Sequence, residues 1–171
     1  MGVLQESIAS VEESTNGIMD AVGKLPEEAI RWKPTPEVWS IHEILCHVDE
    51  AIPYWAEEIE RVVAKPGVEW GRNHQNETRL AAVAVSSQRK TGDVLASIQK
   101  GSQKTVAILR KLKDEDLNIE SPSRNPRFAT KPMSFVLDHL VVTHLRNHFG
   151  QVRRNIEQLS AANPQSAQVQ K

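Results

Sequence analysis

The amino-acid sequence predicts an all-α fold, a four-helix bundle with long connections between the helices. Four stretches carry apolar residues at the three- and four-residue spacing of an amphipathic helix. No stretch alternates apolar and polar residues for long enough to predict a strand. The 171 residues suit one domain with a sizeable core. We therefore expect one domain over residues 1–160 and a flexible, small and polar tail over residues 161–171.

The first helix is expected from about Val3 to Val22, with Gly23 as its stop. Its apolar stripe consists of Leu4, Ile8, Val11, Ile18 and Val22. The segment from Leu25 to Trp39 contains Pro26, Pro34 and Pro36, a content typical of a loop.

The second helix has a clear start, because Ser40 is followed three residues later by Glu43, the spacing of a capping box. Its apolar stripe consists of Ile41, Ile44, Leu45, Val48, Ile52, Trp55 and Ile59. Pro53 falls inside the stripe and predicts a kink. Pro66-Gly67 ends the helix, and residues 68–76 are expected to form a loop.

A third helical region is expected from about Thr78 to Leu112, and it can break at Thr91-Gly92-Asp93. A loop from Leu117 to Thr130 follows, because this stretch contains prolines and serines. The fourth helix is expected to begin near Lys131-Pro132, since proline is allowed in a first helical turn, and to end near Leu159.

Composition narrows the class of protein. The formal net charge of −1 and the pI of about 6.6 give no electrostatic reason to expect a nucleic-acid partner. The longest apolar runs are far shorter than a membrane span, and the first residues lack the pattern of a signal peptide. The single cysteine, Cys46, rules out an internal disulfide. We expect a cytoplasmic protein with no membrane partner.

His144 and His148 carry the strongest chemical signal. They are four residues apart within the fourth predicted helix, so their imidazoles lie on one face. On an α-helical wheel both fall in the middle of the apolar stripe that contains Leu137 and Val141. Burying two imidazoles is costly unless each has a partner, and a metal ion satisfies both. The pair predicts half of a transition-metal site.

A third ligand has to come from another helix, because a catalytic metal commonly takes three protein ligands. His47, two turns into the second helix, is the best candidate. His42 and His139 are expected at the surface or rim, and His74 in a solvated loop that can still reach the mouth of a site. Cys46 is expected to serve in packing.

Two further residues near the histidine pair each allow more than one role. Gly150 is unusual inside a helix, and it predicts either a close approach by a ligand or neighbouring helix or a simple packing contact. Gln151, one turn after His148, can hydrogen-bond a ligand or a partner helix. The tryptophans Trp32, Trp39 and Trp55 are expected to anchor the core and loops.

Three segments make the chain resemble the DinB/YfiT-like superfamily of four-helix-bundle metalloproteins over about residues 3–159. Residues 25–34 (LPEEAIRWKP) resemble the family's link between its first two helices, and residues 39–48 (WSIHEILCHV) resemble the start of its second helix. Residues 144–151 (HLRNHFGQ) resemble its H-x-x-x-H-x-G-Q stretch. Phe149 stands where the family usually has arginine, which puts a substrate contact at that position in doubt.

The resemblance implies a metal triad of His47, His144 and His148. It also implies a divalent transition metal, zinc or nickel first and iron or manganese as alternatives, and a homodimer. Relatives include thiol transferases that use low-molecular-weight thiols such as bacillithiol or mycothiol, and a mycothiol-dependent maleylpyruvate isomerase. Many members have no assigned substrate, so the small-molecule substrate stays open.

These observations favour a metal-dependent enzyme, first of all a thiol S-transferase in which the metal lowers the pKa of a thiol. A metal-dependent hydrolase is the close variant, although no Glu or Asp adjoins the histidine pair as in H-E-x-x-H proteins. A non-catalytic metal-binding or sensing bundle is the alternative, and a purely structural bundle is the simplest one. No catalytic residue besides the metal ligands is predicted.

Overall fold

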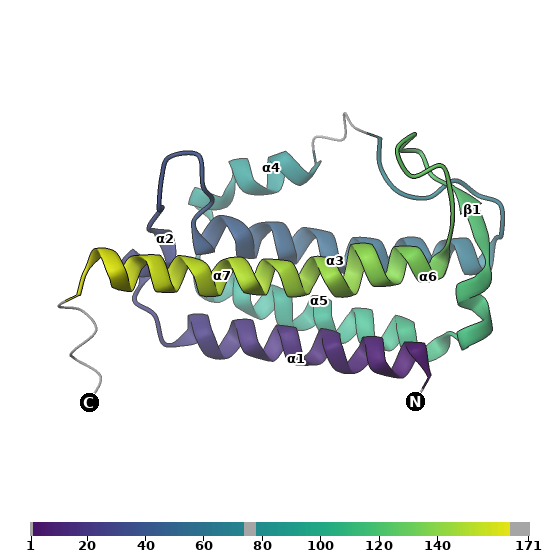
Figure 1. Cartoon of the computed structure of the whole chain (residues 1–171), viewed down its shortest axis with the longest axis horizontal. Coiled ribbons are helices and arrows are strands. Elements are labelled where there is room, and N and C mark those ends of the chain that lie inside the picture. Colours follow the sequence, from purple (N-terminus) through teal and green to yellow (C-terminus); the bar gives the residue numbers. More distant parts are fainter. Residues whose placement is uncertain (1, 74–77, 165–171) are drawn as a thin grey trace.

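The computed structural model describes residues 2–73 and 78–164. Its four long helices are α1 (Val3–Gly23), α3 (Ile41–Ala64), α5 (Thr91–Lys111) and α7 (Thr143–Ala162). α3 packs on α5, α5 on α1, α1 on α7 and α7 on α3, so the four helices close into a bundle (Figure 1). The predicted four-helix bundle is confirmed.

The segment between the first two long helices contains a short helix that the sequence interpretation missed. α2 (Glu27–Arg31) starts after Pro26, and two acidic residues, Glu27 and Glu28, stand in its first turn. Both features stabilise a helix N-terminus, through a fixed φ angle and through the helix dipole. α2 buries Ala29 and Ile30, so five residues suffice to cover one end of the core.

α3 begins with the predicted capping box. The Ser40 hydroxyl accepts a hydrogen bond from the Glu43 backbone N–H at 3.1 Å, and the Glu43 carboxylate accepts one from the Ser40 N–H at 2.7 Å. The helix then continues as one element through Pro53. Because the cap fixes the first residue of α3, it also fixes which face His47 occupies, two turns later.

The third predicted helical region is divided into three elements: α4 (Thr78–Ala84), the 3₁₀ turn η1 (Ser86–Gln88) and α5. The break lies just before Thr91 rather than at Gly92. His42 explains it, because its two ring nitrogens lie 2.6 Å from the Ser86 carbonyl and 3.1 Å from the Thr91 hydroxyl. The side chain on α3 thereby ties down the turn between α4 and α5.

The predicted loop over residues 117–130 contains structure that the sequence did not indicate. The 3₁₀ turn η2 (Asp114–Asn118) leads into β1 (Glu120–Pro122), which pairs antiparallel with β2 (Thr130–Pro132). Trp70 joins this hairpin to the segment after α3, because its indole N–H donates to the Ser121 carbonyl at 2.8 Å. The hairpin therefore covers one end of the bundle (Figure 1).

The fourth helical stretch is continuous but not uniformly α-helical. It starts as α6 (Met133–Phe135), passes through the π-helical segment η3 (Val136–Val142), and continues as α7. The π turn explains the burial of two apolar pairs five residues apart, Val136 with Leu137 and Val141 with Val142. In a regular α-helix these two pairs would not lie on the same face, so both could not point into the core.

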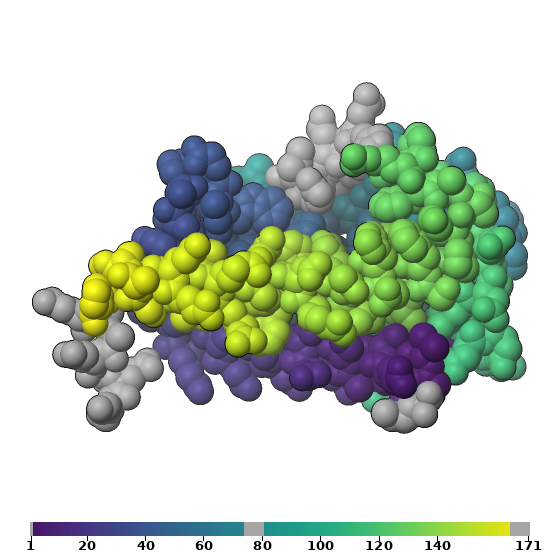
Figure 2. Space-filling model, viewed as in Figure 1, coloured from purple at the N-terminus to yellow at the C-terminus, as the bar shows by residue number. Residues whose placement is uncertain are grey.

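Figure 2 shows α7 lying along α1 on one face of the molecule, with the β1–β2 hairpin at the end near the N-terminus. α7 continues to Ala162, so the first two residues of the expected tail are helical, and residues 165–171 lie outside the described part. Among the described residues, none of the helices has the length and apolar content to cross a membrane.

Candidate metal centre

Three histidines meet where α3 faces α7. His47 lies on α3, and His144 and His148 lie one turn apart on α7. The Nε2 atom of His144 is 3.1 Å from Nε2 of His47 and 2.8 Å from Nε2 of His148. One ring nitrogen from each residue lies within 4.8 Å of the other two. We call these residues the histidine triad; the structure brings together the three residues that the sequence singled out.

Neighbouring side chains fix the orientation of the triad. The Nδ1 atom of His148 is 2.7 Å from Oε1 of Gln151, one turn further along α7. Because a carbonyl oxygen only accepts, Nδ1 carries the proton and Nε2 keeps its lone pair toward the other histidines. The Trp39 ring packs beside the His47 ring with centroids 5.3 Å apart. Gln151 was expected to hydrogen-bond a ligand or a partner helix; its described contact is instead with His148 on the same helix, and a contact with a ligand stays a prediction.

The donor set fits a divalent transition metal. Tetrahedral zinc with nitrogen ligands places neighbouring nitrogens about 3.3 Å apart, close to the 2.8 and 3.1 Å separations in the triad. A single proton can link only one pair of nitrogens at a time, whereas a cation accepts a lone pair from each of three imidazoles. Three neutral imidazoles also leave a further coordination position for a substrate or water. Imidazole suits several metals, so the residues leave its identity open.

The remaining histidines and the cysteine do not belong to the triad. His139 is exposed and stacks on Phe135, as expected for a surface position. His42 is fully buried, so its expected position at the surface or rim is wrong. Burial lowers the pKa of His42, and hydrogen bonds with Ser86 and Thr91 hold its ring in place. Cys46 is buried in the core, and desolvation raises its thiol pKa, in agreement with a packing role. His74 lies outside the described residues.

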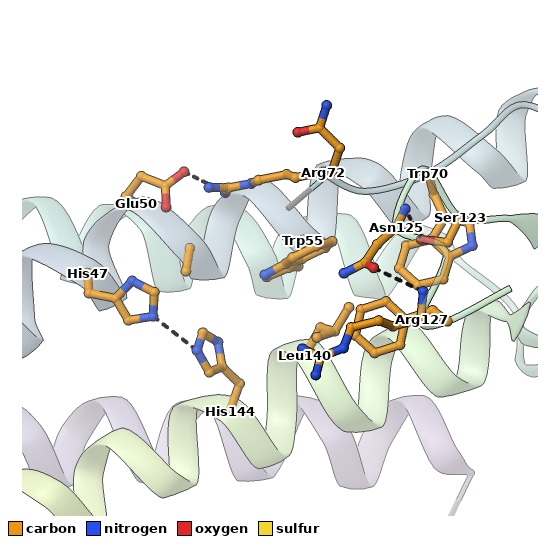
Figure 3. Close-up of a pocket in the computed structure, with 13 residues that line it drawn as sticks. His47, Glu50, Trp55, Trp70, Arg72, Ser123, Asn125, Arg127, Leu140 and His144 are labelled. Atoms are coloured by element: carbon orange, nitrogen blue, oxygen red, sulfur yellow. Dashed lines mark hydrogen bonds and ion pairs between the residues drawn. The ribbon is translucent and has the colours of Figure 1, made fainter. Parts of the chain in front are cut away.

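A cavity of about 400 Å³ opens on one side of the triad, toward the β1–β2 hairpin (Figure 3). We call it the first cavity. His47 and His144 form its inner wall. The rest of its wall combines aromatic and polar side chains with two arginines: Glu50, Ala51, Trp55, Trp70, Arg72, Asn73, Ser123, Asn125, Arg127, Phe128 and Leu140.

A second cavity of about 640 Å³ lies on the other side of the triad and includes all three histidines in its wall. It is formed by the segment before α3 and by the C-terminal half of α7. Its further wall residues are four apolar, four neutral polar and two charged side chains: Pro34, Val38, Trp39, Ile44, Thr35, Gln151, Asn155, Gln158, Glu37 and Arg154. His47 and His144 thus form a partition that both cavities share.

Glu50 and Arg72 are site residues that the sequence interpretation missed. Glu50 follows His47 by three residues on α3, so both face the first cavity. Arg72 forms an ion pair with Glu50 at 2.5 Å (Figure 3), and its guanidinium lies 3.7 Å from the centroid of the Tyr54 ring. The H-x-x-E spacing was visible in the sequence, whereas Arg72 comes from a segment that only the fold brings close.

A buried carboxylate holds the far wall of the first cavity. Glu58 accepts hydrogen bonds from Arg61 at 2.8 and 2.9 Å and from the Gly71 N–H at 2.6 Å. Burial alone would raise the pKa of Glu58, but these hydrogen bonds outweigh it and lower that pKa. Arg124 links the same loop to the hairpin by donating to the Gly71 carbonyl at 3.0 Å. The segment that carries Arg72 is therefore fixed from both sides.

Phe149 and Gly150 do not line either cavity. Phe149 packs against α1, where a Cβ atom on Gly17 would lie only 2.5 Å from its ring. The residue that replaces the family's usual arginine is therefore a packing contact. At Gly150 the nearest atom to an added Cβ is the Arg154 Nη1, at 3.4 Å. No neighbouring helix lies within 4 Å of such a Cβ atom in the described structure, so a helix-packing role for Gly150 is wrong, and the approach of a ligand stays a prediction.

Comparisons with known proteins place this arrangement in a family. The family model described as the DinB superfamily matches residues 11–152. No curated protein matches the chain significantly.

Among solved structures, YfiT from Bacillus subtilis superposes on this chain with a TM-score of 0.77 at 14% sequence identity. The match covers 92% of this chain and 87% of YfiT. YfiT is described as a probable metal-dependent hydrolase with an unusual four-helix bundle topology. The DinB-like protein YjoA from Bacillus subtilis gives a TM-score of 0.63 at 18% identity, over 91% and 92% of the two chains.

A mycothiol-dependent maleylpyruvate isomerase gives a TM-score of 0.62 at 12% identity, and the match covers 91% of this chain but only 59% of that protein. At these identities the structural likenesses show a common fold. The match to the family model spans most of the sequence, and the chain belongs to the DinB superfamily.

Proposed function

We propose that this protein is a metal-dependent enzyme that joins two small molecules at the histidine triad, one of them a low-molecular-weight thiol. The observation that carries this proposal is the pair of cavities that share His47 and His144. A hydrolase needs one organic substrate and water, whereas a group transfer between two organic molecules needs room for both. Cavities of about 400 and 640 Å³ offer that room from opposite sides.

The residues that line the two cavities indicate which substrate each cavity would bind. A divalent cation held by the three imidazoles would lower the pKa of a thiol and supply a thiolate near neutral pH. The second cavity is the larger and carries amide side chains, Gln151, Asn155 and Gln158, which suit a polar thiol rich in hydroxyl and amide groups. Gln151 keeps the proton of His148 on Nδ1, so the Nε2 lone pair faces the shared site.

The experiment measures thiol transfer to monochlorobimane by protein loaded with zinc or nickel, using a panel of low-molecular-weight thiols. We expect at least one thiol to react faster with wild type than with the His148→Ala variant. His139→Ala is the matched control, since His139 is a histidine of the same helical stretch that lies outside the triad. Equal rates for wild type and His148→Ala with every thiol would remove the basis for a transferase.

A metal-dependent hydrolase is the second candidate, and Glu50 is the observation that favours it. Its carboxylate shares the first cavity with His47 and His144, so a carboxylate stands near the triad after all. A carboxylate there can accept a proton from an attacking water. YfiT, which has the same fold, is described as a probable metal-dependent hydrolase.

Glu50→Gln separates the two candidates, because the amide keeps the size of the side chain but cannot serve as a base. For a hydrolase, thiol-free cleavage of a generic ester such as p-nitrophenyl acetate should fall sharply in Glu50→Gln, with thiol transfer absent throughout. For a transferase, the ester should not be cleaved above the background of the His148→Ala variant.

A further inference from the structure

We propose that the first cavity binds the second substrate and that this substrate is a small organic acid with a planar, apolar body. Arg72 and Arg127 would hold the carboxylate, and the tryptophan-lined wall would hold the body. The role as a second substrate rests on the proposed function, whereas binding of the acid is independent of it.

Arg72 is the first support. Its side chain is only 10% exposed, between the Tyr54 ring and Glu50. Its Nε atom is buried without a hydrogen-bond acceptor among the described residues, whereas its Nη2 atom is paired with Glu50 at 2.5 Å. Unsatisfied buried donors are costly, and a guanidinium is suited to binding a carboxylate through two parallel hydrogen bonds. An acid in the cavity would supply the missing acceptor.

The charge balance of the two cavities is the second support. The described wall of the first cavity contains two arginines, Arg72 and Arg127, against one carboxylate, Glu50. The wall of the second cavity contains one of each, Arg154 and Glu37. Glu50 forms an ion pair with Arg72, and no ion pair within the described residues involves Arg127. The first cavity therefore has a surplus positive charge that an anion would balance.

The position of Arg127 is defined by its loop. Its backbone N–H donates to the Asn125 side-chain oxygen at 3.0 Å, and the Asn125 N–H donates to the Ser123 hydroxyl at 3.1 Å (Figure 3). These local bonds shape the turn between β1 and β2. The turn carries Arg127 to the wall of the cavity, although its side chain is largely exposed.

The apolar part of the wall indicates the shape of the ligand. Trp70 is fully buried and stacks with Phe128, with ring centroids 5.8 Å apart and planes 27° from parallel. Trp55 meets Trp70 edge-on at 6.3 Å. The aromatic rings of this wall favour a flat, unsaturated or aromatic body for the part of the ligand that lies against them. A volume of about 400 Å³ limits it to a small molecule.

The test compares two probes of nearly equal shape, trans-cinnamate and its neutral amide, by isothermal titration calorimetry against the metal-free full-length protein. Without metal, a preference for the acid can come only from the protein's own charges. We expect cinnamate to bind about tenfold or more tightly than cinnamamide. Arg127→Met should remove most of this preference, and Arg127→Lys should restore part of it. Arg154→Met, the matched change in the second cavity, should leave it intact.

Arg72→Met should also abolish the preference, and its thermal unfolding temperature shows whether the variant is folded. If Arg72→Met does not fold, Arg127→Met decides the question. Equal affinity for the acid and the amide would overturn the proposal. So would a preference for the acid that survives in Arg127→Met, or one that arises only after zinc is added. Thiol transfer without a preference for acids would leave the proposed function standing and sink this inference alone.

Discussion

The Nδ1 atom of His148 lies 2.7 Å from the side-chain oxygen of Gln151, and this contact decides which nitrogen of His148 faces His144. A histidine that donates from Nδ1 presents a more basic Nε2 to a cation. The contact therefore connects a residue outside the triad to the strength of metal binding.

Replacing Gln151 by Ala should weaken metal binding by about 10- to 100-fold, the range found when a partner of a ligating histidine is removed. Competition with a chromophoric chelator measures the affinity. Gln158→Ala is the control, because Gln158 also lines the second cavity from α7 but has no contact with the triad among the described bonds. An unchanged affinity in Gln151→Ala would show that the hydrogen bond does not orient His148.

Gly17 and Gly150 should respond in opposite ways to substitution by alanine. A Cβ on Gly17 would lie 2.5 Å from the Phe149 ring, so Gly17→Ala should destabilise the protein by about 1–3 kcal/mol through overpacking. A Cβ on Gly150 meets only the flexible end of Arg154 at 3.4 Å, so Gly150→Ala should stabilise α7 by about 0.5–1 kcal/mol. Urea unfolding measures both values.

Adding Phe149→Leu to Gly17→Ala should recover part of the lost stability, because the smaller side chain leaves room for the methyl group. If Gly17→Ala were as stable as wild type, the close approach of α1 and α7 at Phe149 would be wrong.

His42 should make stability depend on pH. Burial lowers its pKa below the value of about 6.5 that it has in the unfolded chain. The unfolded chain therefore takes up a proton that the folded protein resists, and the contribution of His42 is fully present above pH about 6.5 and lost as the pH falls from there through the folded pKa.

The measurement is the difference in unfolding free energy between wild type and His42→Gln, recorded on metal-free protein from pH 8 to pH 5. This difference should shrink on acidification, since the glutamine cannot be protonated. A difference that is constant over this range would mean that His42 is not buried as a neutral side chain.

Much of the fold could be predicted from local patterns. The stripes of α1 and α3 and the capping box at Ser40 specify each element within a short window, and local hydrogen bonds and packing enforce them. The pair His144 and His148 was predictable for the same reason, because four residues on a helix define a shared face. His47 was placed by the register that the cap gives to α3.

The remaining features depend on contacts between distant segments. The hairpin β1–β2 is stabilised by Trp70, which lies 51 positions before its partner Ser121. The rim position expected for His42 was wrong because its partners come from the turn before α5 and from Thr91. One feature of the sequence indicated the π turn, namely the apolar pairs that recur after five residues between Val136 and Val142. An α-helical wheel does not show this spacing.

The metal content of the protein tests the central claim most directly. Untagged protein from the native host, analysed by mass spectrometry of the metals, should carry close to one equivalent of a divalent transition metal per chain. His47→Ala and His144→Ala should each lose it to a similar degree while retaining helical circular dichroism, and His139→Ala should keep it. Less than about a tenth of an equivalent in folded wild type, or unchanged content in His47→Ala, would contradict a metal centre at the histidine triad.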